Sequence, residues 1–145
     1  VDKVESPMGL KLSSTVGSYS PVHCTSLGKI LLAFQPQDRR RQLISDLDLR
    51  SYTANTITRK RLLQTQLNEV RTQSYALDRE ELELGLICVA VPVFNQQREL
   101  IAALSAAGPA NRFRENALGE YVGILQQGAS AIQSRIGSFS LKTIM

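Results

Sequence analysis

Long hydrophobic runs, clustered cysteines and tryptophan are all missing from this chain of 145 residues. Its longest apolar stretch, Leu84–Phe94, is interrupted by Pro92 and is far shorter than the roughly 20 residues that a membrane-spanning helix needs. Two cysteines in a chain with no secretory leader indicate free thiols in a reducing compartment and not a disulfide framework. We therefore expect a cytoplasmic protein that has no membrane partner.

Aromatic residues are also few, and they are not interleaved with basic residues as a stacking surface for single-stranded nucleic acid would require. The net charge of +4 is mild. Its densest basic clusters, Arg39–Arg41 and Arg59–Arg61, fall where amphipathic helices turn their solvated faces outward. These clusters predict helix surface, and DNA contact by this segment is not supported.

Residues for nucleophilic catalysis are scarce. His23, the only histidine, would have to serve as the base, and no Gly-x-Ser-x-Gly element surrounds Ser105. Ser26 and Lys29 have the Ser-x-x-Lys spacing of penicillin-interacting enzymes, but the companion Ser-Asp-Asn and Lys-Thr-Gly elements are absent. A helix start followed by a solvated lysine is the preferred interpretation, and we expect no enzyme.

A metal site is disfavoured for a similar reason. His23, Cys24, Asp78 and Cys88 could supply zinc ligands, yet they lack the Cys-x-x-Cys or His-x-x-x-His spacing of known sites. We expect no metal and no cofactor. A redox or metal sensor that uses Cys24 and Cys88 is kept as an alternative, although the acidic run 78–83 would raise the thiol pKa that such a sensor must lower.

The apolar content of 43% is enough for one buried core, and its periodicity predicts four helices. The first is capped by Thr25 or Ser26 and ends before Pro36, and a second runs from about Pro36 to Asp46. The third is capped by Thr58, with an apolar face of Leu63, Leu67 and Val70. The last covers residues 115–136, with an apolar stripe that forms core or a dimer face: Leu118, Tyr121, Leu125, Ala129, Ile132 and Ile136.

Strands are predicted at 1–5, at 10–14 and as a hairpin within 84–108. If Asn95 and Arg98 face each other in the hairpin loop, Cys88 lies opposite Ser105, and Leu86 lies opposite Ala107. One hairpin face is then bulky and suited to a helix-packed core: Ile87, Val89, Val91, Val93, Leu100, Ala102, Leu104 and Ala106. The other face is small and only slightly polar: Cys88, Ala90, Ala103, Ser105 and Ala107.

The small face has two interpretations, which the spacing does not separate. A large side chain from elsewhere could fill the space, or the space could be a cavity with a floor that offers one hydroxyl and one thiol to a small ligand. The acidic run 78–83 reads as a solvated loop before the strand. Asp78 could instead overhang the cavity and accept a hydrogen bond from a ligand.

Seven strings, in order, carry a resemblance to a known family: Val1–Ser6, Leu12–Gly17, His23–Lys29, Asn55–Thr58, Asp78–Glu81, Gly85–Phe94 and Ala103–Pro109. Together they resemble the effector-binding domain of bacterial IclR-type transcription regulators, from the first residue to about Gly137. The resemblance implies a GAF-like α/β (α+β) domain at 1–137, an antiparallel sheet with helices on both faces, followed by a tail at 138–145. It also implies an opening helix and strand, and an N-terminal winged helix-turn-helix, that are absent here.

The resemblance further implies the effector-binding residues: Leu12, Ser26, Leu27, Asp78, Cys88, Ser105 and Ala107. Ala107 replaces a serine that many members have, so one hydrogen bond to the ligand is lost there. The free amides of Ser26 and Leu27 at a helix start favour a carboxylate-containing metabolite.

Regulation requires two states that the ligand binds unequally, and closure of the Asp78 loop is the expected difference between them. In the intact regulator, this change would alter binding to DNA by the absent domain. We expect a homodimer or tetramer. A purely structural dimerisation module is the remaining alternative.

Overall fold

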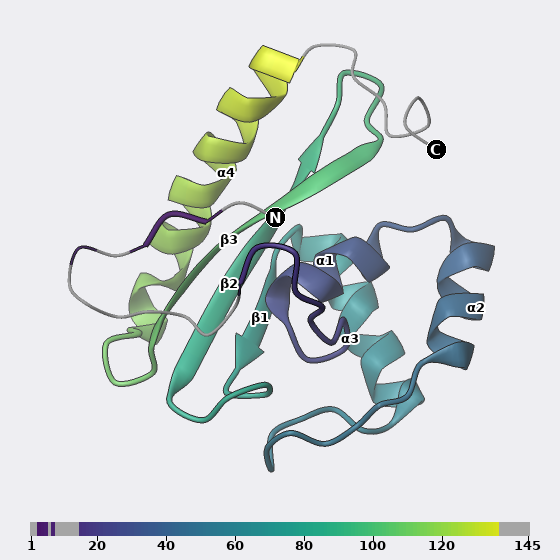
Figure 1. The fold of residues 1–145 in the computed structure, drawn as a ribbon. Coiled ribbons are helices and arrows are strands. Elements are labelled where there is room, and N and C mark those ends of the chain that lie inside the picture. The colour runs from purple at the N-terminus through teal and green to yellow at the C-terminus, as the bar shows by residue number, and fades with distance from the viewer. Residues whose placement is uncertain (1–2, 6, 8–14, 137–145) are drawn as a thin grey trace.

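The computed structural model describes residues 3–5, 7 and 15–136. An antiparallel sheet of three strands separates two layers of helices (Figure 1). The strands are β1 (Ala76–Arg79), β2 (Leu86–Phe94) and β3 (Leu100–Pro109), in the order β1-β2-β3. The helices are α1 (Ser26–Ala33), α2 (Gln37–Asp46), α3 (Lys60–Gln73) and α4 (Leu118–Ile136), with a 3-10 turn at Glu115–Ala117 before α4. This arrangement confirms the predicted antiparallel sheet with helices on both faces.

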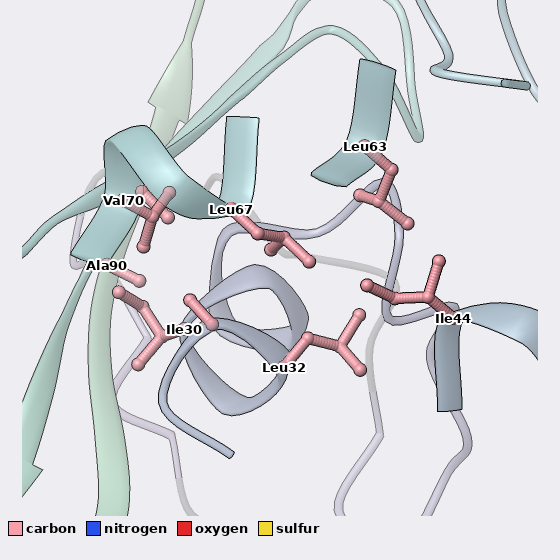
Figure 2. Close-up of a cluster of buried hydrophobic side chains, with 9 residues drawn as sticks. Ile30, Leu32, Ile44, Leu63, Leu67, Val70 and Ala90 are labelled. Atoms are coloured by element: carbon pink, nitrogen blue, oxygen red, sulfur yellow. The ribbon is translucent and has the colours of Figure 1, made fainter. Parts of the chain in front are cut away.

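Helix α1 lies directly on one face of the sheet and is the centre of the larger core. Apolar residues occupy most of its positions, so it buries Ile30, Leu32 and Ala33 in this core, with Ile30 beside Ala90 of β2 and Leu32 toward Ile44 of α2 (Figure 2). Leu63, Leu67 and Val70 of α3 close over it with the predicted spacing, as Figure 2 shows. The cluster is completed by Ile44, Ala76 and Ala90.

Helix α4 covers the opposite face of the sheet, where Val89, Val91 and Val93 of β2 are buried beneath it. Its apolar stripe packs on these valines over most of its length, so the stripe is core and is not a free dimer face. Ile136 at the end of the helix is 37% exposed. Among the described residues, no helix is long and apolar enough to cross a membrane.

The pairing of β2 with β3 differs from the predicted register. Cys88 lies opposite Ala107, and Ser105 lies opposite Ala90, so the expected Cys88–Ser105 and Leu86–Ala107 pairs are wrong. Two features each shift the register by one residue. The loop closes between Asn95 and Glu99 and not between Asn95 and Arg98, with two backbone hydrogen bonds inside the loop. A further shift of one residue occurs in the strands at Val93/Phe94.

A slip of two residues keeps every side chain beyond the bulge on its predicted face, because the side-chain period of a strand is two. Cys88 and Ser105 therefore share the α1 face although they are not opposite each other. Within the bulge the faces exchange. Leu100 packs with the α1 cluster, in contrast to the prediction, and Ile101 packs with the α4 cluster.

Several local expectations need correction. Strand β1 lies where a solvated loop was expected, and helix α3 is capped at Arg59 with no side-chain hydrogen bond, not by Thr58. Residues 3–5 form no strand, and the strand expected at 10–14 lies outside the described residues. Arg40 was expected to be solvated, but it is 8% exposed and its guanidinium donates to the Ala33 carbonyl at the end of α1.

Candidate functional site

The start of α1, the helix that covers one face of the sheet, leaves two backbone amides without a hydrogen-bond partner among the described residues. Thr25 has an extended backbone and caps the helix, since its Oγ1 accepts from the Gly28 amide at 3.2 Å. The Lys29 amide bonds to the Thr25 carbonyl at 3.0 Å. Within the described part of the chain, no acceptor reaches the amides of Ser26 and Leu27, and the helix dipole adds partial positive charge there.

Gly28 brings this helix start close to the preceding turn. A Cβ atom at position 28 would lie 2.4 Å from the Val22 Cα and 2.6 Å from the Thr25 Oγ1. Glycine is therefore required for the turn to pack against α1. The cap and this close approach together fix where the free amides point.

The sheet beneath α1 presents two rows of small residues. One row runs across the strands through Ala76, Ala90 and Ser105. The next row, nearer the turn between β1 and β2, runs through Asp78, Cys88 and Ala107. Ser105 is half-buried and Ala107 is exposed, so this face is accessible at β3 and closed at β1.

Asp78 is a strand residue, 2% exposed, and does not lie on a loop. Its Oδ1 accepts the Glu81 amide at 2.8 Å, which stabilises the turn after β1. Burial raises the pKa of Asp78 to about 6, although its backbone hydrogen bonds oppose this rise. The expected placement of Asp78 on a loop is therefore wrong, while closure of the turn after β1 over a ligand stays a prediction.

Lys29 is completely buried, which contradicts the expectation of a solvated lysine. Its Nζ lies 2.5 Å from the Glu81 Oε1 and donates to the Leu77 carbonyl at 2.8 Å. Burial lowers the pKa of Lys29, and the adjacent Glu81 carboxylate opposes that effect. Glu81 was expected to be solvated but is only 5% exposed, and no group of the described residues forms a hydrogen bond with its Oε2.

The loop between α2 and α3 forms hydrogen bonds both with the turn after β1 and with the segment that precedes α1. Thr56 donates to the Glu81 carbonyl at 2.6 Å, and Thr53 donates to the Glu80 carbonyl at 2.7 Å. At its other end the Arg50 carbonyl lies 2.9 Å from the Nε2 of the buried His23. His23 therefore has a structural role as a tie between two loops.

Both cysteines lie close enough to Asp78 for its charge to act on their thiols. Burial raises the pKa of Cys24 to about 12, with further contributions from the charges of Asp78 and Glu81. Burial also raises the pKa of Cys88 to about 12, and Asp78 adds to this through its charge and a hydrogen bond with the thiol. No group of three or more histidine, cysteine or acidic residues suited to a metal ion occurs among the described residues.

The structure thus brings together most of the predicted site. Asp78, Cys88 and Ala107 share one row, Ser105 lies in the next row, and Ser26 and Leu27 begin the helix that covers this face. Leu12 lies outside the described residues. The principal additions are Lys29 and Glu81. The sequence does contain a signal for this pair. Lys29 lies in a helix that is apolar on nearly every side, where a charge is stable only when it is paired.

A hollow of about 220 Å³ lies on the opposite face of the sheet, under the start of α4. Of the predicted site residues that the structure describes, only Ala107 lines it. The rest of its wall consists of Ile87, Val89, Ala106, Gly108, Pro109, Arg112, Phe113 and Tyr121. This hollow does not include the α1 start, Asp78 or Cys88. It is therefore distinct from the candidate site.

Comparison with known proteins now gives the family. Residues 1–134 match the model of the "Bacterial transcriptional regulator IclR C-terminal" family, and the chain belongs to it. The chain is 38% identical over 137 residues to the HTH-type transcriptional regulator KdgR of Escherichia coli, covering 94% of this chain and 52% of that protein. The reported relatives are transcription regulators and not enzymes. The chain spans about half the length of the curated relatives it matches.

Two solved structures are also similar. The Thermotoga maritima IclR structure superposes with a TM-score of 0.87 at 34% identity, covering 94% of this chain and 55% of that one. The inducer binding domain of PobR from Acinetobacter, solved as a double mutant in complex with 3-hydroxybenzoic acid, superposes with a TM-score of 0.76 at 35% identity. That comparison covers 91% of this chain and 74% of the PobR chain.

Proposed function

We propose that this chain is the ligand-sensing part of a bacterial transcription regulator, and that it binds a small carboxylate-containing metabolite on the α1 face of the sheet. The observation that carries the proposal is the juxtaposition of two open amides at Ser26 and Leu27 with the small row Asp78, Cys88 and Ala107. The complex of a double mutant of the PobR inducer binding domain with 3-hydroxybenzoic acid supports the choice of an organic acid.

The ligand that matches this site has an anionic end and a polar body. Its carboxylate would accept from the amides of Ser26 and Leu27, which the helix dipole favours. Its body would lie over Cys88 and Ser105, and a hydroxyl would reach Asp78. Leu12 would line one wall. Ala107 offers no hydrogen bond, so affinity for a very small, highly polar acid is reduced and a larger acid is favoured.

In the whole protein, the bound metabolite would control DNA binding through a winged helix-turn-helix domain N-terminal to residues 1–137. Binding must favour one of two conformations, since equal affinity for both would change nothing. Such a regulator works in the cytoplasm as a homodimer or tetramer on paired half-sites. Because the α4 stripe is core, the subunit contact must use other surfaces.

Isothermal titration with 3-hydroxybenzoate and its neutral amide tests the ligand site. The acid should bind and the amide should bind far more weakly, because only the acid has a negatively charged carboxylate that can accept from the amides at the start of α1. Ser105→Ala should weaken binding by about 1 kcal/mol, and Cys88→Leu should block the site by volume. Ser130→Ala, at an exposed serine of α4, is the matched control and should bind as the parent does. Equal binding of acid and amide, or of the parent and both site variants, would place the site elsewhere.

The alternative functions give different results in the same assays. A redox sensor needs a thiol of lowered pKa, whereas the pKa values of Cys24 and Cys88 are both raised, so no observation favours that function. A purely structural dimerisation module would show no response to any acid.

A further inference from the structure

Among the described residues, the buried charges around Asp78 leave one negative charge without a counter-charge. Lys29 contributes one ammonium, while Glu81 and Asp78 contribute two carboxylates. The other titratable groups that face Asp78 are the thiols of Cys24 and Cys88, which burial keeps neutral. Glu83, an exposed residue between β1 and β2, raises the pKa of Cys88 through its charge and adds further negative charge near this site.

Lys29 is committed to other partners. Its Nζ lies 2.5 Å from Glu81 Oε1, where it forms the ion pair, and 2.8 Å from the Leu77 carbonyl. Asp78 is held instead by dipoles, namely the Glu81 amide at 2.8 Å, the Leu82 amide and the Cys88 thiol. These bonds orient the carboxylate but do not neutralise it. The charge of Lys29 also lowers the pKa of Asp78, but less than burial raises it.

An effector that lies over Cys88, with its carboxylate at the amides of Ser26 and Leu27, would bring a second negative charge into the site that contains Asp78. Both charges would be partly shielded from water, since Asp78 is 2% exposed and α1 covers the strands on which it and Cys88 lie. Two carboxylates that share such a site do not both remain ionised, so one of them retains a proton.

We propose that binding of an anionic effector is coupled to uptake of one proton by Asp78, which then donates a hydrogen bond to the effector. This inference rests on the proposed function, because it requires the effector to occupy the row that contains Asp78 and Cys88. It gives the sensor a response that depends on both the acid and the pH. Protonated Asp78 also becomes a donor, which favours effectors that offer a second acceptor oxygen.

The expected pH dependence follows from the free protein. Burial raises the pKa of Asp78 to about 6, so the carboxyl is mostly ionised at neutral pH and must be protonated on binding. Uptake of one proton makes the dissociation constant rise about tenfold per pH unit above that pKa. Between pH 6 and 8, we therefore expect affinity for the acid to fall by up to about 100-fold.

Isothermal titration of the chain with 3-hydroxybenzoate at pH 5.5, 7 and 8 measures this coupling. Repeating each titration in buffers of different ionisation enthalpy gives the number of protons taken up, which we expect to approach one at pH 7. Asp78→Asn carries the amide in place of the protonated acid. It should bind without proton uptake, with the same affinity at all three pH values, and more tightly than the parent at pH 8.

Glu83→Gln is the matched control, because it removes an exposed carboxylate near Cys88 and leaves Asp78 in place. It should keep the pH dependence of the parent. Binding with no proton uptake, or an Asp78→Asn variant that binds more weakly than the parent at pH 8 while its thermal unfolding is unchanged, would overturn the coupling alone. Failure of the acid to bind the parent at every pH would overturn the proposed function for this acid.

Discussion

Lys29 of α1 and Glu81 of the turn after β1 form an ion pair of 2.5 Å that is almost completely removed from solvent. The pair joins the helix that carries the open amides to the turn that holds Asp78. Its geometry therefore determines how the two halves of the candidate site meet. Such a pair is weak evidence for stability, because desolvation offsets its attraction, but breaking it leaves a buried charge without a partner.

Removing one member of the pair should be strongly destabilising. Lys29→Ala leaves the Glu81 carboxylate buried and unpaired, and we expect a loss of about 3–5 kcal/mol in the free energy of unfolding. Urea denaturation measures this loss. The double variant Lys29→Met/Glu81→Leu should recover much of it, because it removes both charges together.

The exposed pair of Arg79 and Glu115 provides the control. Its side chains are 54% and 76% exposed, so Arg79→Ala should cost less than about 1 kcal/mol. If Lys29→Ala were as mild as Arg79→Ala, the Lys29 ammonium would not be buried in solution.

Asp78 should make the protein less stable as pH rises. Its pKa is raised from 3.8 to about 6, so the folded state holds the proton more tightly than the unfolded state does. The resulting stabilisation is complete below pH 3.8, is lost as pH rises through about 6, and is absent above that. At about 1.4 kcal/mol per unit, the total is on the order of 3 kcal/mol.

The stability of Asp78→Asn should lack this decline between pH 4 and 6, and above pH 6 the variant should be more stable than the parent. Urea denaturation at several pH values measures both. Glu115→Gln serves as the control, because that exposed carboxylate should leave the profile unchanged. A parent profile that rises between pH 4 and 6, and that Asp78→Asn flattens, would mean that Asp78 is ionised and stabilising.

The two thiols should react slowly in the folded protein. With a pKa of about 12, Cys24 and Cys88 are almost entirely protonated at pH 8, and only the thiolate is nucleophilic. We expect alkylation by iodoacetamide about a thousandfold slower than in urea-unfolded protein, measured by mass spectrometry. Fast native labelling of either cysteine would favour the redox-sensor function instead.

The sequence predicted the helices and the two sheet faces well because both depend on local periodicity. Strand β1 was missed because only four residues of it alternate, and the charged run that follows reads as loop. The two-residue register slip depends on one extra loop residue and on the bulge at Val93/Phe94, neither of which changes the hydrophobic pattern. The burial of Lys29 and Glu81 is a long-range property: 52 residues separate them, and each looks solvated until the other is in place.

Gly28 and Gly123 should respond in opposite directions to the same substitution. Both lie in helices, where alanine is intrinsically more favourable by about 0.5–1 kcal/mol. A Cβ atom at Gly123 meets nothing within 4 Å, so Gly123→Ala should raise the melting temperature of the chain by a few degrees.

At Gly28 the added Cβ atom would lie 2.4 Å from the Val22 Cα and 2.5 Å from the Val22 carbonyl oxygen, both of which are backbone atoms. Neither atom moves without displacing the turn that precedes α1, and the Thr25 hydroxyl that caps the helix is 2.6 Å away. Gly28→Ala should therefore cost at least about 2 kcal/mol by overpacking and loss of the cap, and should also weaken binding of 3-hydroxybenzoate at the open amides. Thermal unfolding of the two variants beside the parent measures this contrast. If Gly28→Ala were as stable as Gly123→Ala, the start of α1 would not pack against Val22, and the amides of Ser26 and Leu27 would not be held in the orientation that the proposed site requires.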